Sequence, residues 1–211
     1  MYLTIIIPMY NESGVITTTL ERLRAIEMPG FVTQVEVIVV DDCSTDVTAG
    51  LAEKISLSFP GTKVIRLPVN AGKGAAVAAG VREANGNTIL VQDADLELDP
   101  KDIPSLLRRM HNLNLDLVSG TRFGSGSGYP VHAIAAVTLN RLLSAITAKT
   151  TGRRITDLTC GYKLIRKELF DKLDLREQRF GFETELMFKA LRVATCTFAE
   201  EPVSYSPRRR T

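Results

Sequence analysis

The stretch that decides the fold is Ile89-Leu90-Val91-Gln92-Asp93-Ala94-Asp95-Leu96-Glu97. Its first three residues are apolar, which is typical of a short strand buried inside a parallel sheet. Asp93 and Asp95 follow where that strand ends, and side chains two residues apart on extended backbone point the same way. Two converging carboxylates are costly unless a cation neutralises them. Oxygen ligands with no His or Cys nearby favour Mg²⁺ or Mn²⁺.

The acidic stretch therefore predicts a divalent-metal site formed by Asp93, Asp95 and Glu97. Such a metal keeps open positions for waters and substrate phosphates, so we expect it to bind a pyrophosphate group. The alternative is a solvated acidic turn, in which Asp99 caps the helix that follows Pro100.

The composition bounds the class of protein. The chain has 211 residues, of which 45% are hydrophobic and 24% charged, as is usual for one globular domain with its own core. A net charge of +2 gives no argument for a nucleic-acid partner. The three cysteines are widely spaced, which favours a reducing, cytoplasmic compartment. Residues 1–8 are predicted to form a first strand rather than a signal peptide.

Short apolar segments alternate with helical ones along the first hundred residues. Strands are expected at 3–7, 35–40, 64–67 and 89–91, with helices between them at 15–23, 51–57 and 75–84. This alternation predicts an α/β fold with a mostly parallel sheet. The second half is less regular, with helices expected at 101–113, 131–149 and 182–193, and strands at 115–119, within 157–166 and within 195–205.

Polar turns follow the first four predicted strands, at 8–12, 41–46, 70–74 and 93–97. In parallel sheets, ligands bind beyond the carboxyl ends of the strands. We therefore expect the four turns to gather on one rim of the sheet. Neither Gly72-Lys73-Gly74 nor the glycine-rich loop 124–128 matches a complete phosphate-binding motif.

These turns belong to a longer series of motifs. In order they are Pro8-Met9-Tyr10-Asn11-Glu12, Val40-Asp41-Asp42-Cys43-Ser44-Thr45-Asp46, Asn70-Ala71-Gly72-Lys73-Gly74, Asp93-Ala94-Asp95, Gly120-Thr121-Arg122, Thr156-Asp157-Leu158-Thr159-Cys160-Gly161-Tyr162, Gly181-Phe182-Glu183-Thr184-Glu185 and Pro202-Val203-Ser204-Tyr205. The series resembles the family 2 glycosyltransferases of GT-A fold. Within that family it is most similar to the dolichyl-phosphate mannose and glucose synthases.

The resemblance implies one GT-A catalytic domain over residues 1–211, with a nucleotide-binding half (1–100) and an acceptor-binding half (101–211). It implies an inverting, metal-dependent transfer of a hexose from a UDP-glucose or GDP-mannose type of donor to a polyprenyl or dolichyl phosphate. Two alternatives stay open: transfer to a soluble or glycan hydroxyl group, and a non-catalytic module that binds nucleotide sugars. The sequence leaves the donor base, the sugar and the oligomeric state undecided.

The resemblance also implies roles on the donor side. Pro8, Tyr10 and Glu12 resemble the floor under the nucleoside. Asp42, together with Asp41, resembles the contact to the base or ribose, with helix capping as the alternative.

Further along the donor side, Lys73 is implied to lie near the base or the diphosphate, and the alternative is a solvated loop lysine. Asp93, Asp95 and Glu97 match the metal-holding positions, and Asp93 and Ala94 are also implied to contact the bound donor.

On the acceptor side, Arg122 and Arg141 match arginines that contact phosphate, for which the guanidinium fork is suited. The pattern departs at Ala145, where a serine is expected. A phosphate acceptor is already anionic and needs no strong base, whereas a hydroxyl acceptor would need one, for which Asp157 and Glu183 are the candidates. Glu183 could instead be a first-turn carboxylate favoured by the helix dipole.

The predicted helix 131–149 carries more apolar residues than one core-facing stripe requires. Basic residues follow it at Lys149, Arg153 and Arg154, and a second basic cluster comprises residues 208–210. This pattern predicts peripheral contact with the cytoplasmic face of a membrane, where each basic residue contributes about 1 kcal/mol. The alternative is a buried helix or a dimer face.

Overall fold

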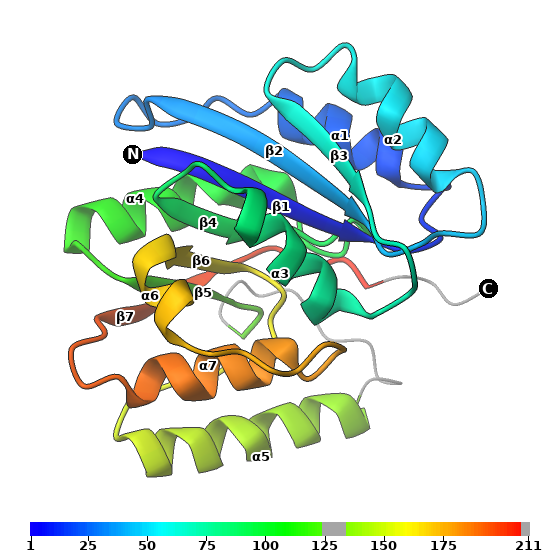
Figure 1. Ribbon diagram of the computed structural model, residues 1–211. Helices are drawn as coiled ribbons and strands as arrows, with labels where there is room; N and C mark the ends of the chain where they lie inside the picture. The colour runs from blue at the N-terminus through cyan, green and yellow to red at the C-terminus, as the bar shows by residue number, and fades with distance from the viewer. Residues whose placement is uncertain (124–133, 208–211) are drawn as a thin grey trace.

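The computed structural model describes residues 1–123 and 134–207, and within them seven strands form one sheet in the order β3-β2-β1-β4-β6-β5-β7 (Figure 1). The strands are β1 (Tyr2–Met9), β2 (Gln34–Asp41), β3 (Thr62–Arg66), β4 (Thr88–Val91), β5 (Leu117–Thr121), β6 (Lys163–Arg166) and β7 (Phe198–Pro202). The helices are α1 (Ile16–Arg24), α2 (Thr48–Ser56), α3 (Lys73–Glu83), η1 (Pro100–Asp102), α4 (Ile103–Leu113), α5 (Ile134–Thr151), α6 (Lys167–Lys172) and α7 (Phe182–Arg192).

The strand directions bring most of the carboxyl ends to one edge. β1 pairs in parallel with β2 and β4, and β2 pairs in parallel with β3. β6 is antiparallel to both β4 and β5, so β5 runs in the same direction as β4. β7 is parallel to β5. The predicted α/β fold with a mostly parallel, mixed sheet is therefore confirmed.

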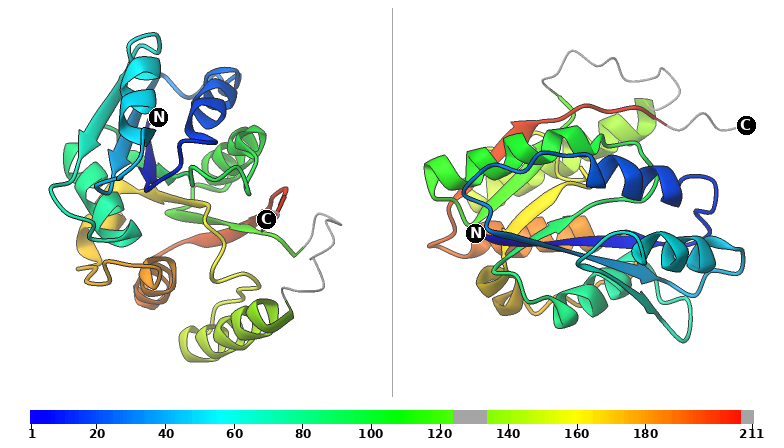
Figure 2. Two further views of the ribbon diagram at one scale, coloured as in Figure 1. Left: turned by 90° about the vertical axis from the view of Figure 1, so that its right-hand side faces the viewer. Right: turned by 90° about the horizontal axis from the view of Figure 1, so that it is seen from above.

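The central strands carry apolar residues on both of their faces because helices cover both faces of the sheet. Ile5 and Ile7 pack in one core cluster with residues of α1 and α4. Ile6, whose side chain points to the opposite face, packs in a second cluster with residues of α3, α6 and α7. Figure 2 shows these two helical layers on either side of the sheet.

Several boundaries differ from the predicted ones. The strand expected within 157–166 is confined to Lys163–Arg166, because the carboxylate of Glu200 accepts hydrogen bonds from the backbone of Thr156 and Asp157 and holds this segment as a loop. The C-terminal segment forms a single strand, β7, that pairs along β5. The first residues of the long helix predicted from 131, the glycine-rich loop 124–128 and the basic cluster 208–210 lie outside the described residues.

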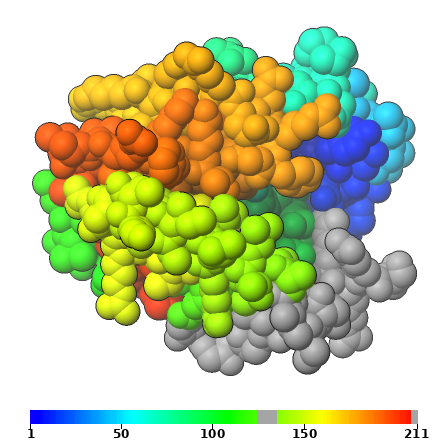
Figure 3. Space-filling model, turned by 90° about the horizontal axis from the view of Figure 1, so that it is seen from below, coloured from blue at the N-terminus to red at the C-terminus, as the bar shows by residue number. Residues whose placement is uncertain are grey.

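Helix α5 lies on the outside of the molecule, beside α7 (Figures 1 and 3). Its buried polar side chains are those of Asn140, Ser144 and Thr147. Its outer face exposes Leu139, Leu142 and Ile146, at 57%, 57% and 49%. The alternative of a buried apolar helix therefore does not hold. In the described part of the chain, no helix combines the length and the apolar character needed to cross a membrane.

Candidate active site

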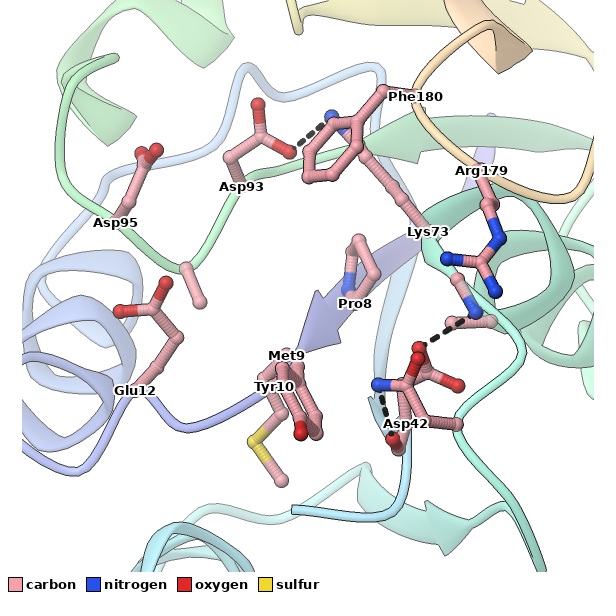
Figure 4. Close-up of a pocket in the computed structure, with 14 residues that line it drawn as sticks. Pro8, Met9, Tyr10, Glu12, Asp42, Lys73, Asp93, Asp95, Arg179 and Phe180 are labelled. Carbon is pink, nitrogen blue, oxygen red and sulfur yellow. Dashed lines mark hydrogen bonds and ion pairs between the residues drawn. The ribbon is translucent and has the colours of Figure 1, made fainter. Parts of the chain in front are cut away.

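A cavity of about 360 Å³ opens at the carboxyl ends of β1, β2 and β4 (Figure 4). It contains residues from all four turns that the sequence placed on one rim. Its lining comprises Pro8, Met9, Tyr10, Glu12, Asp42, Asn70, Gly72, Lys73, Ala76, Asp93, Ala94, Asp95, Arg179 and Phe180. We call it the donor-side cavity.

A second cavity of about 270 Å³ lies next to it, and we call it the acceptor-side cavity. Its lining comprises Lys73, Asp93, Glu97, Leu98, Arg122, Thr159, Gly161, Phe180, Glu183 and Tyr205. Lys73, Asp93 and Phe180 line both cavities, so these three side chains form the boundary between them.

The two aspartates at the end of β2, Asp41 within the strand and Asp42 directly after it, have different environments. Asp42 lines the donor-side cavity, and its carboxylate accepts hydrogen bonds from the backbone N–H groups of Ala71 (2.8 Å) and Gly72 (2.7 Å). Asp41 is fully buried, accepts a hydrogen bond from the backbone N–H of Ser44 and lies 3.3 Å from Arg66 Nε. Asp42 therefore faces the cavity and fixes the loop after β3, while Asp41 shapes its own turn.

Lys73, the first residue of α3, is not a solvated lysine. Its ammonium group forms ion pairs with Asp93 (2.5 Å) and with Glu183, and the side chain is largely buried. Burial alone would lower the pKa of Lys73, but the charges and hydrogen bonds of Asp93 and Glu183 outweigh it and raise the pKa above its ordinary value. Lys73 therefore stays cationic and neutralises part of the negative charge at the end of β4.

The three residues predicted to bind metal are divided between the cavities. Asp95 lines the donor-side cavity, Glu97 lines the acceptor-side cavity, and Asp93 lines both. Strand β4 ends at Val91, residues 94–95 already form a turn, and Leu96 has a φ of 61°. The extended backbone that the prediction assumed between Asp93 and Asp95 is therefore wrong, because the chain turns between them. Among the residues that the structure describes, no three His, Cys, Asp or Glu side chains gather as a metal-binding group.

A metal site that is completed by its substrate fits this arrangement. Mg²⁺ is commonly held by one or two carboxylates, with waters and substrate phosphates as the other ligands. Asp93 and Asp95 supply two carboxylates beside an open cavity. A side chain at Gly161 would collide with Asp93 Oδ2, so the glycine leaves this carboxylate the room that it occupies.

A buried hydrogen-bonded pair supports the backbone of Asp93. The hydroxyl of Tyr162 donates to Gln92 Oε1 at 2.6 Å, and Gln92 Nε2 donates to the carbonyl oxygen of Asp93 at 2.9 Å. Both side chains are fully buried. Neither residue was assigned a role from the sequence, although a glutamine directly after a buried strand is a polar group that needs a partner.

Arg122 and Asp157 form one unit at the acceptor-side cavity. Arg122 Nε and Nη2 donate to the two Asp157 carboxylate oxygens, at 2.8 and 2.7 Å, and the backbone N–H of Arg122 donates to the same group at 2.9 Å. Asn140 on α5 donates to Asp157 Oδ1 at 2.7 Å. Burial raises the pKa of Asp157, but the hydrogen bonds and charge of Arg122 outweigh it, and the pKa lies below its ordinary value.

The remaining predicted residues are less closely gathered. Glu183, in the first turn of α7, lines the acceptor-side cavity and pairs with Lys73. Arg141 is exposed on α5, and its guanidinium carbon lies 5.2 Å from the centre of the Phe123 ring rather than in the lining of either cavity. Arg179 and Phe180 line the donor-side cavity but belong to a segment without any motif, so sequence analysis gave no reason to select them.

Residues 4–174 match the family model described as Glycosyl transferase family 2. The chain therefore belongs to this family, as the motifs predicted. A curated relative, the dodecaprenyl-phosphate galacturonate synthase of Rhizobium johnstonii, is 32% identical over 85% of this chain and 52% of its own. The dolichol-phosphate mannosyltransferase of Pyrococcus furiosus is 30% identical over 90% of this chain and 53% of its own. The chain thus spans about half the length of these two relatives.

A solved structure has the same fold. It is that of glucosyl-3-phosphoglycerate synthase from Mycobacterium tuberculosis in complex with Mn²⁺, UDP and glucosyl-3-phosphoglycerate. The match has a TM-score of 0.74 and 21% identity, and it covers 100% of this chain and 73% of that chain. The GT-A glycosyltransferase fold predicted from the motifs is therefore confirmed.

Proposed function

We propose that this chain is the catalytic domain of an inverting glycosyltransferase that moves a hexose from a UDP- or GDP-sugar to a polyprenyl phosphate. The observation that carries the proposal is the pair of adjoining cavities, one lined by Asp93 and Asp95 and the other by Arg122. The names of the two curated relatives, both of which include a polyprenyl phosphate, support this acceptor.

The donor-side cavity is proposed to bind the nucleotide sugar. Pro8, Tyr10 and Asp42 line the part proposed for the nucleoside, and Asp93 and Asp95 would hold Mg²⁺ or Mn²⁺ beside the diphosphate. When bound, such an ion stabilises the negative charge of the departing nucleoside diphosphate. The solved neighbour in complex with Mn²⁺ and UDP supports a divalent ion. Glu97 is proposed to add negative charge from the acceptor side.

The acceptor-side cavity favours a phosphate over a hydroxyl group. Arg122 lines this cavity with a guanidinium that can bind two phosphate oxygens, and Asp157 holds it in place. Both carboxylates considered as bases are already engaged, Asp157 by Arg122 and Glu183 by Lys73. A lowered pKa makes Asp157 a weak base, which suits an acceptor that needs no deprotonation. We assign Asp157 a positioning role.

We further propose that α5 rests on the cytoplasmic face of a membrane. Its exposed residues Leu139, Leu142 and Ile146 would enter the interface, with Arg141 near the lipid phosphate. An apolar helix face of this kind gains free energy at a bilayer surface and is costly in water. In this arrangement residues 1–100 supply most of the donor-side cavity, which faces the aqueous side, and Arg179 and Phe180 complete it. The acceptor-side cavity takes residues from both halves, so the predicted division at residue 100 is only approximate.

The test combines binding with transfer. A thermal-shift screen of UDP- and GDP-sugars with Mn²⁺ identifies the donor, because a ligand raises the melting temperature by mass action. The labelled donor is then offered with undecaprenyl phosphate in liposomes and with a water-soluble alcohol. Transfer to the lipid supports the proposal. Transfer to the alcohol alone would indicate a soluble-acceptor transferase, and donor binding without turnover would indicate a binding module.

A further inference from the structure

Phe180 is an aromatic residue at the centre of the site that the roles proposed above leave unused. Its side chain is 89% exposed, although it lines both cavities. Figure 4 shows the ring beside the ion pair of Lys73 and Asp93. An exposed aromatic ring leaves a large apolar surface in water, so its presence here is not explained by the stability of the fold.

The loop that carries Phe180, residues 175–181 between α6 and α7, is fixed by α7. The carboxylate of Glu185 accepts hydrogen bonds from the backbone N–H groups of Arg176 (2.9 Å) and Glu177 (2.7 Å). Glu177 Oε1 in turn accepts from the backbone N–H of Arg179 at 2.9 Å. The backbone of Arg179, next to Phe180, is thus held by Glu177, whose own backbone is held by Glu185.

The same loop rests on the first turn of α3. The backbone N–H of Ala75 donates to the carbonyl oxygen of Gln178 at 3.0 Å. A side chain at Gly72 or Gly74 would collide with the backbone of residues 177–178, so these glycines allow the close contact. Because the loop is attached to both α3 and α7, Phe180 is held at the boundary of the two cavities.

Phe180 differs in chemistry from the other two residues on this boundary. Lys73 and Asp93 are charged and attract water, whereas the phenyl ring excludes it. The boundary is also where the sugar would pass from the donor to the acceptor. Closing a site to water limits the hydrolysis of reactive donors.

We propose that Phe180 is a wall that shields the anomeric carbon of the bound donor sugar from water. This inference rests on the proposed function. In transfer, an acceptor phosphate oxygen bonds to the anomeric carbon while the bond to the nucleoside diphosphate breaks. In hydrolysis, a water oxygen forms that bond instead and releases a proton to the solvent. Phe180 favours the first reaction over the second by limiting the access of water.

The experiment measures how the labelled donor partitions between glycolipid and free sugar. Phe180→Ala is expected to raise the ratio of free sugar to glycolipid several-fold, with a small change in the donor KM. Phe180→Leu restores apolar bulk and is expected to return the ratio most of the way to the wild-type value. Leu57→Ala is the matched control, because Leu57 is equally exposed, at 90%, at the end of α2.

Three outcomes would contradict the proposal that Phe180 shields the anomeric carbon from water. The ratio could be unchanged in Phe180→Ala, Phe180→Leu could behave like Phe180→Ala, or transfer and hydrolysis could fall together, which would make Phe180 a substrate-binding residue. If the wild-type chain neither transfers nor hydrolyses any donor, the proposed glycosyltransferase function is wrong, and so is the proposed role of Phe180. Thermal unfolding of each variant checks that the fold is retained.

Discussion

Helices α3 and α5 are both rich in small and apolar residues, yet they are oriented in opposite ways. α3 buries Ala76 and Val77 against the sheet. α5 buries Asn140 and Ser144 and exposes Leu142 with its apolar neighbours. An apolar composition therefore shows that a helix has apolar surface to remove from water, but it does not show what that surface packs against. The apolar face of α3 packs against the sheet, and we propose that the apolar face of α5 packs against a membrane surface.

The inward polar face of α5 has a specific connection to the acceptor-side cavity. Asn140 donates to Asp157 and accepts a hydrogen bond from the backbone N–H of Thr159, and Ser144 Oγ accepts from the backbone N–H of Leu158. Asp157 in turn holds Arg122. The helix with the exposed apolar face is thus linked by two hydrogen-bonded side chains to the proposed phosphate-binding arginine. No comparable connection is needed at α3, whose first residue enters the site directly.

The largest effect is expected at Asp95, on the α3 side of this comparison. Asp95→Ala removes a proposed metal ligand, and the several kcal/mol of transition-state stabilisation that a metal supplies correspond to a loss of transfer of about a thousandfold or more. The measurement is transfer activity against Mn²⁺ concentration. Asp99→Ala is the control, because Asp99 caps η1 from the same acidic segment without lining either cavity. Wild-type activity of Asp95→Ala in excess Mn²⁺ would contradict the metal assignment.

Arg122→Ala is expected to have the next largest effect, on the α5 side. It leaves the buried carboxylate of Asp157 without its charged partner, which typically costs about 3–5 kcal/mol of unfolding free energy. Arg122→Lys keeps the charge but loses the fork, so it should weaken acceptor use with a smaller loss of stability. Urea unfolding, acceptor kinetics and nucleotide calorimetry measure the three quantities. Equal loss of nucleotide affinity would move Arg122 to the donor side.

The sequence predicted the features that depend on neighbouring residues. The alternation of apolar segments was enough to predict the parallel strands, and the turns after them met at one edge because parallel strands share their direction. The pairings of Lys73 with Glu183 and of Arg122 with Asp157 join residues far apart in the chain, and no local pattern encodes them. Phe180 was not identified because its position depends on how its loop packs on α3.

The excess of apolar residues in α5 was visible in the sequence, but the sequence alone did not decide between an outward apolar face and a buried helix. Asn140 and Ser144 are buried because they accept hydrogen bonds from the backbone of residues 158–159, which form a loop before β6. With its polar residues engaged inside, the helix turns Leu139 and Leu142 to the outside. Which face of such a helix is exposed depends on the groups that hydrogen-bond to its polar side chains, here the backbone N–H groups of residues 158–159.

The smallest expected effects are changes in stability, and they compare one apolar residue of α3 with one of α5. Val77→Ala, in the core under α3, is expected to cost about 2 kcal/mol of unfolding free energy through lost burial and a cavity. Leu142→Ala on α5 should change it by less than about 0.5 kcal/mol, because its side chain is exposed. Urea unfolding of both variants provides the values. A comparable loss at Leu142 would show that α5 is covered by protein.

The most direct test of the account is transfer to a long-chain polyprenyl phosphate in liposomes and to a short-chain, water-soluble analogue, both measured in a triple variant. Leu139→Ser, Leu142→Ser and Ile146→Ser remove the exposed apolar face of α5. Leu113→Ser, at an exposed leucine of α4, is the control. We expect the triple variant to lose transfer to the liposome-bound acceptor while keeping transfer to the short one. Equal activity of the wild type and the triple variant on both acceptors would contradict a membrane-facing α5.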